Sequence, residues 1–313
     1  MDTQTSKVHY SLLSAEIVVG QLTCEVPERR KVKELLITGS HGFIGSSFKE
    51  HFREHRHSFN IREGDREGNC NKRVDIVLDF AAYGNMYGQN EPDLIYQSNV
   101  TRLLNLLKNT DKYKYRAFIV TGSSSEYGKR LIPMNEYMVP KPETFYAASK
   151  VAAAMLGLAW AKERDKPVVV VRPFTVTGVG DQEKHLIPTL IRSCIEGEKM
   201  KFVANPMHDF VDIRDFISGV LTIIRYIDKS KGQIFNIGSG QQHSNQEVRE
   251  IVEKVTGKKA NVELVPELRT YDTPMWEADI FKLKSLGWKP EISLEETITD
   301  MVKNYYEFKR KIA

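Results

Sequence analysis

From Glu34 onward, short apolar runs alternate with longer amphipathic stretches, and this alternation limits the fold more than any other feature of the sequence. The apolar runs are bounded by turn or charged residues and predict β-strands at 34–38, 58–62, 74–80, 117–121 and 168–172. Of the stretches between them, 93–108 and 144–164 most clearly predict helices. Strands and helices in alternation build a parallel sheet covered on both faces. We therefore predict an α/β protein with a doubly wound parallel sheet.

Two segments depart from this alternation. Residues 63–73 separate the second strand from the third by about a dozen positions, too few for the helix that normally joins parallel strands. The first 33 residues precede the sheet and contain one strand-like run, 15–24. We hypothesise that this run joins the sheet where the usual edge strand is lost.

A glycine-spaced turn, with Gly39, Gly42 and Gly45, follows the first strand directly and leads into a helix. Glycines let the backbone turn tightly and approach a pyrophosphate, and the free amides at a helix start attract negative charge. A plain strand-to-helix connection can have the same glycines. The strand before the turn, the helix after it and the further strand beyond favour a Rossmann-like dinucleotide-binding domain at 34–176.

The end of the second strand normally decides between NAD and NADP, because an acid binds the ribose hydroxyls of NAD and an arginine accepts the extra phosphate of NADP. Glu63 lies near the expected acid position, but Arg62 precedes it and Arg66 follows. The two arginines fit a solvated charged loop equally well. The choice between NADH and NADPH stays open.

Tyr146 and Lys150 are four residues apart in the predicted helix 144–164, so both side chains project from one face. An ammonium group near a phenol lowers the tyrosine pKa and makes the phenol a usable proton donor, as carbonyl reduction requires. Two other pairs with this spacing lie beside a helix-breaking proline or in a polar helix far from the glycine turn; they are Tyr137/Lys141 and Tyr305/Lys309.

The strand at 117–121 runs into a serine-rich turn, Ser123-Ser124-Ser125, which Glu126 follows. Open α/β sheets bind ligands at the carboxyl ends of their strands. A hydroxyl at this edge can hydrogen-bond a reacting carbonyl, but a serine-rich surface turn would have the same composition. The turn alone leaves both interpretations open.

Together these motifs resemble the extended short-chain dehydrogenase/reductase family, in the branch that acts on nucleotide-linked sugars, from about residue 34 to the end. Further matches extend the resemblance along the chain. They are Asp79-Phe80-Ala81-Ala82, Asn99-Val100, Arg172-Pro173-Phe174, the segments 209–215 and 269–272, and Leu286-Gly287-Trp288.

The resemblance implies a role for each matched residue. Tyr146 is expected to donate the proton, Lys150 to tune its pKa and bind the ribose, and Ser123 to orient the sugar carbonyl, with Ser124 as the fallback. The implied ligands of NAD(P)H are Gly39, His41, Gly42, Phe43, Ile44, Gly45, Arg62, Glu63, Phe80, Ala81, Ala82, Asn99, Thr121, Lys150 and Pro173. The implied ligands of a nucleotide-diphosphate sugar are Tyr83, Ser124, Ser125, Thr175, His185, His208, Arg269 and Asp272.

The chain departs from the family pattern near the expected active site. Dehydratases of the family place an acid directly after the active-site hydroxyl, whereas Ser124 and Ser125 follow Ser123, and Glu126 arrives one position late. Dehydration is therefore disfavoured relative to simple reduction. Three further departures affect the expected diphosphate contacts: Thr175 replaces an asparagine, His208 an arginine and Arg102 a glycine.

The resulting prediction is an NAD(P)-dependent oxidoreductase that reduces the C4 ketone of a nucleotide-linked 4-keto-6-deoxyhexose, in deoxysugar or surface polysaccharide biosynthesis. The segments 172–188 and 268–272 most resemble such ketoreductases. Two alternatives stay open. One is a nucleotide-sugar 4-epimerase with tightly bound NAD, and the other is a non-catalytic dinucleotide-binding scaffold on the same fold.

After residue 176 the alternation loosens, and helices are predicted at 245–256 and 294–309. We expect 177–208 and 241–313 to form a smaller substrate-binding lobe, and a segment near 209–240 to return to the sheet. The N-terminal extension occupies 1–33. The resemblance implies a homodimer, formed through the helices at 93–108 and 144–164.

Composition argues against several other classes. No apolar run approaches the roughly 20 residues of a membrane-spanning helix. The net charge of +4 suits a small anionic ligand, but no basic run with interleaved aromatics suggests a nucleic-acid groove. Cys24, Cys70 and Cys194 have no metal-ligand spacing. We expect a cytoplasmic protein with free thiols and with no metal, membrane anchor or nucleic-acid partner.

Overall fold

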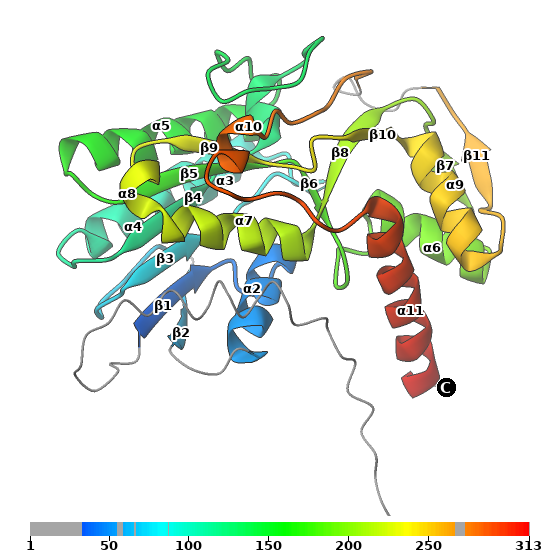
Figure 1. The fold of residues 1–313 in the computed structure, drawn as a ribbon, viewed down its shortest axis with the longest axis horizontal. Helices are drawn as coiled ribbons and strands as arrows, with labels where there is room; N and C mark the ends of the chain where they lie inside the picture. The colour runs from blue at the N-terminus through cyan, green and yellow to red at the C-terminus, as the bar shows by residue number, and fades with distance from the viewer. Residues whose placement is uncertain (1–32, 55–58, 66, 87, 267–272, 313) are drawn as a thin grey trace, which may run out of the picture.

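The computed structural model describes residues 33–54, 59–65, 67–86, 88–266 and 273–312 (Figure 1). Its central element is a six-stranded parallel sheet with the strand order β2-β1-β3-β4-β5-β9. The strands are Lys33–Thr38 (β1), Phe59–Glu63 (β2), Ile76–Asp79 (β3), Ala117–Thr121 (β4), Val168–Pro173 (β5) and Ile234–Ile237 (β9). The predicted Rossmann-like α/β fold is confirmed.

Helices cover both faces of the sheet, and each face has its own apolar core (Figure 1). Because successive strand residues point to opposite faces, Leu35 and Ile37 of β1 enter one core and Leu36 enters the other. The first core is covered by α2 (Phe43–Glu54) and α7 (Ile213–Arg225). The second is covered by α4 (Arg102–Thr110) and α5 (Phe145–Glu163).

The helix predicted at 93–108 is present but is not a regular α-helix. It consists of α3 (Pro92–Tyr96), the π-helix η1 (Gln97–Thr101) and α4, in direct succession. The helix predicted at 144–164 is α5, whose first turn is capped by the Thr144 hydroxyl, which accepts the Ala147 N–H at 3.0 Å.

The described residues of the connection from β2 to β3 form no helix, as its length predicts. Both strands pair with β1, on opposite sides, so the chain must cross β1 within residues 64–75. The loop packs on α4, where the side-chain amides of Asn105 and Asn109 donate to the carbonyls of Glu67 at 3.3 Å and Gly68 at 3.0 Å. A loop held by α4 therefore replaces the crossover helix. The strand hypothesised at 15–24 lies outside the described residues and stays a hypothesis.

A second lobe has its own apolar core (Figure 1). Its helices are α6 (Leu186–Glu196), α9 (Asn245–Thr256) and α11 (Leu294–Ile312). One small sheet joins β6 (Thr175–Thr177), β8 (Met207–Asp212) and β10 (Gln242–Ser244), and another joins β7 (Met200–Phe202) and β11 (Val262–Leu264). Two short helices, α8 (Ile227–Ser230) and α10 (Phe281–Lys284), pack instead on the main sheet, since Ile227 and Leu283 enter its first core. Within the described residues, no helix has the length and apolar character to span a membrane.

Candidate active site

The glycine turn follows β1 and is closed by a hydrogen bond from the Gly42 N–H to the Gly39 carbonyl at 2.9 Å. Gly39 has a φ of 64°, and a Cβ added there would lie 2.7 Å from the backbone nitrogen of Ala81. A Cβ added at Gly45 would lie 2.2 Å from the Gly39 oxygen, so both positions require glycine. Helix α2 begins at Phe43, and its first amides have no acceptor within the helix. This cradle fits the pyrophosphate of a dinucleotide.

The side chains of Arg62 and Glu63, the last two residues of β2, have different partners. The Glu63 carboxylate lies 2.8 Å from Lys49 Nζ and 3.5 Å from Nε2 of His41, a residue of the glycine turn. The hydrogen bond from Lys49 holds the pKa of Glu63 below its usual range. The Arg62 guanidinium instead donates to Glu34 of β1 at 2.6 Å. The acid is therefore beside the turn, whereas the arginine is engaged along the sheet.

Lys150 reaches from α5 to the end of β4, where its ammonium donates to the Thr121 carbonyl at 2.7 Å. The side chain is buried, and burial lowers the pKa of Lys150 to about 8, although the nearby carboxylates of Asp79 and Glu126 act in the opposite direction. Lys150 Nζ lies 5.9 Å from the centre of the Tyr146 ring. The predicted pair on one helix face is therefore present, with the cation beside the ring.

The Tyr146 phenol forms a hydrogen bond with Ser123. Burial raises the pKa of Tyr146 to about 12, and the bond with Ser123 only partly offsets this. The lowered phenol pKa expected from the sequence is therefore wrong for this structure, because burial raises the pKa of Tyr146 by more than Ser123 lowers it. At neutral pH the Tyr146 phenol is therefore protonated.

The three serines of the turn after β4 face different partners. Ser123 Oγ lies 2.7 Å from Ser125 Oγ and accepts the Ser125 N–H at 3.1 Å. Ser124 is buried, and its hydroxyl accepts the indole N–H of Trp276 at 3.2 Å. Ser123 is thus the serine that meets Tyr146, while Ser124 is turned toward the C-terminal segment.

Glu126 supports this turn from inside the protein. Its Oε1 accepts the Ser123 N–H at 2.8 Å, and its Oε2 lies 2.7 Å from Nη2 of Arg172. Both carboxylate oxygens therefore have donors, and the side chain is fully buried. Glu126 is held as a structural ion-pair partner, which does not fit the role of a dehydratase acid.

Asn99 joins the loop after β3 to the helix that carries Tyr146. Its side-chain amide accepts the Tyr83 N–H at 2.9 Å, and donates to the Tyr83 carbonyl at 2.8 Å and to Ser149 Oγ at 2.9 Å. A Cβ added at Gly84 would lie 3.2 Å from Tyr146 Cδ2, so this loop packs directly on the tyrosine. Asn99 thereby places the Tyr83 loop at the candidate site.

The other residues predicted to bind the cofactor lie at the carboxyl ends of the same strands. The partly buried Phe80 packs on the core, with its ring centre 4.7 Å from that of Phe48. Pro173 ends β5. Thr121 ends β4, and its Oγ1 is a buried atom without a hydrogen-bond partner among the described residues. An unsatisfied hydroxyl at this edge fits a site that a polar ligand completes.

The remaining predicted substrate ligands fall into three groups. His185 precedes α6, its Nδ1 is 2.7 Å from Asp181 Oδ1, and a Cβ added at neighbouring Gly180 would lie 4.0 Å from Phe43, so this loop adjoins the glycine turn. Thr175 starts β6, and His208 lies in β8 opposite His243 of β10, within the second lobe. The last group lies outside the described residues; it comprises Arg269 and Asp272.

Several residues that support the site were not predicted from the sequence, among them Ser149, Trp276 and the ion pair of Asp79 with Arg102. Ser149 and Trp276 carry no local signal, because their partners are distant in sequence. Arg102 does carry a local signal in the sequence. It opens a helix whose following residues, Leu103, Leu106 and Leu107, are fully buried, and a charge beside such a stripe requires a buried partner.

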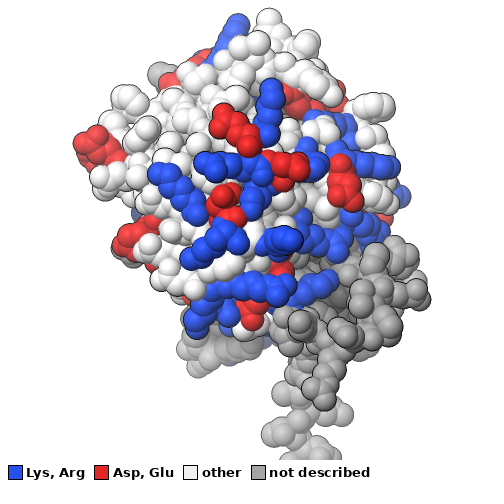
Figure 2. Space-filling view, turned by 90° about the vertical axis from the view of Figure 1, so that its left-hand side faces the viewer, with Lys and Arg blue, Asp and Glu red and all other residues white. Residues whose placement is uncertain are grey.

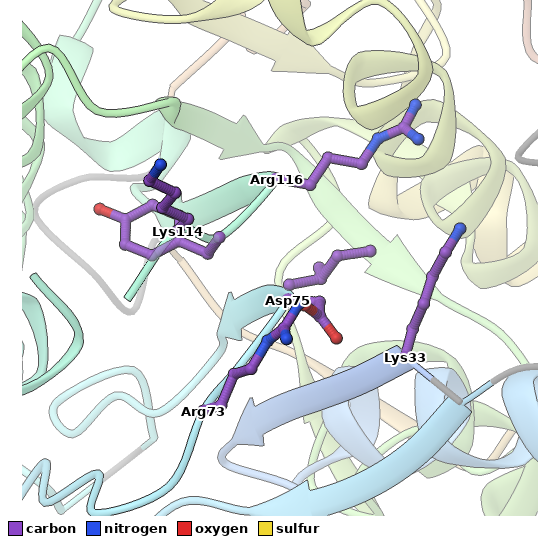
Figure 3. A pocket seen from close by; sticks show the side chains of 7 residues that line it. Lys33, Arg73, Asp75, Lys114 and Arg116 are labelled. Atoms are coloured by element: carbon purple, nitrogen blue, oxygen red, sulfur yellow. The ribbon is translucent and has the colours of Figure 1, made fainter. Parts of the chain in front are cut away.

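A cavity of about 380 Å³ lies at the opposite edge of the sheet (Figure 3). Its lining residues are Lys33, Arg73, Asp75, Ile76, Lys114, Tyr115 and Arg116. They lie at the amino ends of β1, β3 and β4, whereas the candidate active site follows the carboxyl ends. The cavity is therefore separate from the candidate active site. Figure 2 shows lysine and arginine side chains gathered over one face of the molecule.

Comparison with known proteins agrees with this geometry. The family model described as "NAD dependent epimerase/dehydratase family" matches residues 57–238, which begin after the glycine turn. A UDP-glucose 4-epimerase from Lactobacillus helveticus is 28% identical over 255 residues, covering 74% of this chain and 76% of the relative. A GDP-6-deoxy-D-mannose reductase from Pseudomonas aeruginosa is 26% identical over 306 residues, covering 87% and 97%.

Solved structures point the same way. The structure of MoeE5 in complex with UDP-glucose and NAD has a TM-score of 0.80 and 25% identity, and the match covers 90% of this chain and 100% of that one. The expected resemblance to nucleotide-sugar enzymes of the extended short-chain dehydrogenase/reductase type is confirmed, as is the NAD(P) dependence of the family. The similar proteins include both an epimerase and a reductase.

Proposed function

The chain belongs to the NAD dependent epimerase/dehydratase family, and we propose that it uses NAD(P)H to reduce the C4 ketone of a nucleotide-linked 4-keto-6-deoxyhexose. The turn after β4 carries the proposal. Ser123 meets Tyr146, serines occupy the next two positions, where the family's dehydratases have acids, and Glu126 is bound to Arg172. This turn keeps the groups for proton donation and lacks those for removal of water.

The similarity to a GDP-6-deoxy-D-mannose reductase supports the same reaction class, because the alignment covers 97% of that enzyme. The proposal therefore covers both lobes of the chain, and the second lobe is assigned the nucleotide-diphosphate sugar. A reductase of this class would act in deoxysugar or surface polysaccharide biosynthesis.

In this reaction the bound dinucleotide supplies the hydride that adds to C4. The chain supplies the proton and the geometry. Ser123 Oγ hydrogen-bonds the ketone oxygen, and Tyr146 transfers its phenolic proton to that oxygen, so that the ketone becomes a secondary alcohol. The Lys150 ammonium stabilises the phenolate that Tyr146 leaves behind. The raised pKa of Tyr146, about 12, keeps the proton on the phenol until the ketone oxygen gains charge.

The direct test follows the absorbance of NADH and NADPH separately with a panel of nucleotide-linked 4-keto-6-deoxyhexoses, and identifies each product by NMR. We expect oxidation of one equivalent of cofactor for each C4 alcohol formed. A Tyr146→Phe variant provides the background rate. If neither cofactor is oxidised with any member of the panel, the reductase proposal is wrong.

A redox-neutral 4-epimerase is the second candidate, and the similarity to UDP-glucose 4-epimerases favours it. Such an enzyme holds its NAD tightly and returns the hydride to the opposite face of the same ketone. The two functions differ in a simple measurement. Purified protein that carries bound dinucleotide and interconverts C4 epimers without net consumption of NAD(P)H would establish the epimerase and exclude the reductase.

We also propose that the protein is a homodimer assembled through α3 and α5. Four apolar side chains of these helices are more than two-fifths exposed: Leu94 at 46%, Tyr96 at 59%, Phe145 at 66% and Met155 at 43%. An apolar helix face of this kind is typical of a subunit interface. Light scattering after gel filtration should give twice the chain mass of 35.9 kDa, and Met155→Glu should shift it toward the monomer.

A further inference from the structure

Arg102 replaces the glycine that the family resemblance leads us to expect, yet its side chain is only 5% exposed. Its guanidinium meets the Asp79 carboxylate through Nη1 to Oδ1 at 2.7 Å and Nη2 to Oδ2 at 3.0 Å. Nη2 also donates to the Ala81 carbonyl at 3.2 Å, and Nε donates to the Ser98 carbonyl at 2.9 Å. Each guanidinium nitrogen has an acceptor, which is the condition for burying an arginine at low cost.

The Asp79 side of this ion pair reaches the glycine turn. The Thr38 hydroxyl donates to Asp79 Oδ1 and accepts the Ala81 N–H at 3.1 Å. Thr38 and Asp79 are register partners at the carboxyl ends of β1 and β3. Gly39, directly after Thr38, packs so closely on Ala81 that no side chain fits between them. The ion pair therefore fixes the glycine turn against the end of β3.

The Arg102 side of the pair accounts for the π-helix. In a regular α-helix the Arg102 N–H would bond to the carbonyl of Ser98, four residues earlier. Here it bonds to the carbonyl of Gln97, five residues earlier, and the Ser98 carbonyl accepts Arg102 Nε instead. The side chain thus satisfies the carbonyl that the backbone N–H leaves, and this stabilises the wider turn.

The π-helix in turn holds Asn99, whose side-chain amide binds Tyr83 and Ser149. Ser149 Oγ donates to the Tyr146 carbonyl at 2.7 Å. A continuous series of contacts therefore runs from the glycine turn, through Asp79 and Arg102, to the helix that carries Tyr146 and Lys150.

We propose that Asp79 and Arg102 are a pair of positioning residues, which sets the glycine turn and α5 at the separation that the reaction requires. The reaction itself rests on the function proposed above, but the geometric role of the pair does not. The pair is a feature of this chain, because a glycine at 102 would leave Asp79 without its cation and the Ser98 carbonyl without its donor.

The pair also faces Lys150, which allows an electrostatic test. Asp79 approaches from the end of β3, Arg102 from α4, Glu126 from the turn after β4, and Tyr146 from the same helix. The two carboxylates favour the ammonium form, and Arg102 disfavours it. Removing Arg102 alone should move the alkaline limb of the pH–rate profile to higher pH, and removing Asp79 alone should move it to lower pH.

The geometric part can be tested without a substrate, by comparing crystal structures of the wild type and the double variant Asp79→Asn/Arg102→Gly. We expect the double variant to have a regular α-helix across 97–101, with the Asn99 amide displaced from Ser149. Fluorescence titration should show NAD(P)H binding weakened roughly tenfold, because the glycine turn is no longer fixed. An unchanged π-helix with unchanged Asn99 contacts would overturn the proposal.

The electrostatic part is tested by the pH profiles of Arg102→Gln and Asp79→Asn, which should move in opposite directions. Arg102→Lys keeps the charge but loses the forked geometry, and should lower kcat roughly tenfold or more with little movement of the limb. If Arg102→Gln does not fold, Arg102→Lys takes its place in the experiment. Arg214→Gln is the matched control, because Arg214 forms a similar forked ion pair with Asp212 at the start of α7, away from the glycine turn and Lys150.

If Arg102→Gln and Arg214→Gln change Tm, kcat and the alkaline limb equally, the pair has no specific role and the proposal is wrong. Absence of reductase activity in the wild type would contradict the proposed function alone. The crystal structures and the NAD(P)H titration would still test the role of Asp79 and Arg102.

Discussion

The Glu126 carboxylate lies 2.7 Å from Nη2 of Arg172, and the two side chains are 0% and 1% exposed. The guanidinium also stacks 4.5 Å from the centre of the Tyr127 ring. Removing one partner of such a buried pair leaves an uncompensated charge, which typically costs about 3–5 kcal/mol. We therefore expect Glu126→Gln to lose about that much free energy of unfolding in urea denaturation.

An exposed ion pair provides the control for this prediction. Glu263 lies 2.8 Å from Lys199, but both side chains are largely solvent-exposed. Glu263→Gln should change the free energy of unfolding by less than about 1 kcal/mol. Equal stability of Glu126→Gln and the wild type would show that the buried pair does not hold the serine turn.

Tyr146→Phe removes the proton donor while preserving the ring. We expect kcat/KM for the ketosugar to fall by roughly 10²–10⁴. The affinity for NAD(P)H, measured by fluorescence titration, should stay within about twofold, because the glycine turn is untouched. Tyr137→Phe is the matched control, since Tyr137 belongs to another tyrosine–lysine pair and is 82% exposed. Full activity of Tyr146→Phe would show that the Tyr146 phenol is not the proton donor.

The pKa of Lys150, lowered by burial to about 8, predicts an alkaline loss of activity. The ammonium form is lost as pH rises through about 8, so kcat/KM should fall roughly tenfold per pH unit above that point. A pH profile in a buffer of constant ionic strength measures this directly. A rate that stays flat to about pH 10 would show that the charge on Lys150 is not required.

Lys150 also affects the pH dependence of stability, and here the effect of raising the pH is favourable. The pKa of Lys150 is about 8 in the folded protein and 10.5 as its ordinary value, so the folded state binds fewer protons between these limits. The Lys150 contribution to the free energy of unfolding therefore rises with pH in this window. Lys150→Met should remove that contribution, which urea denaturation at about pH 8 and about pH 10 would detect relative to the wild type.

A structural feature of this protein can be predicted from the sequence when the residues that cause it are close together in the chain. The five predicted strands and the helix at 245–256 follow from apolar periodicity and caps, and the structure has them within two residues of the predicted bounds. The turn at Gly39 follows from its spacing. Periodicity cannot show the π-helix at 97–101, because its cause is the Arg102 side chain and a carboxylate 23 residues away. The orientation of Arg62 likewise depends on Glu34 of the neighbouring strand.

The orientations of Glu63 and Arg62 lead to a prediction about the cofactor, which the sequence left open. The Glu63 carboxylate adjoins the glycine turn, where it can accept the ribose hydroxyls of NADH and repel the added phosphate of NADPH. We expect kcat/KM to favour NADH by roughly tenfold or more. Glu63→Gln should reduce that preference, because Lys49 and His41 then face the phosphate without the carboxylate.

Arg62→Gln is the control for the cofactor prediction, because the Arg62 guanidinium is bound to Glu34 at 2.6 Å. It should leave the ratio of kcat/KM for NADH and NADPH within about twofold of the wild-type ratio, since no contact with the phosphate is lost. A wild-type preference for NADPH that Arg62→Gln abolishes would contradict the prediction. It would mean that Arg62 leaves Glu34 when the dinucleotide binds, and that its guanidinium binds the added phosphate of NADPH.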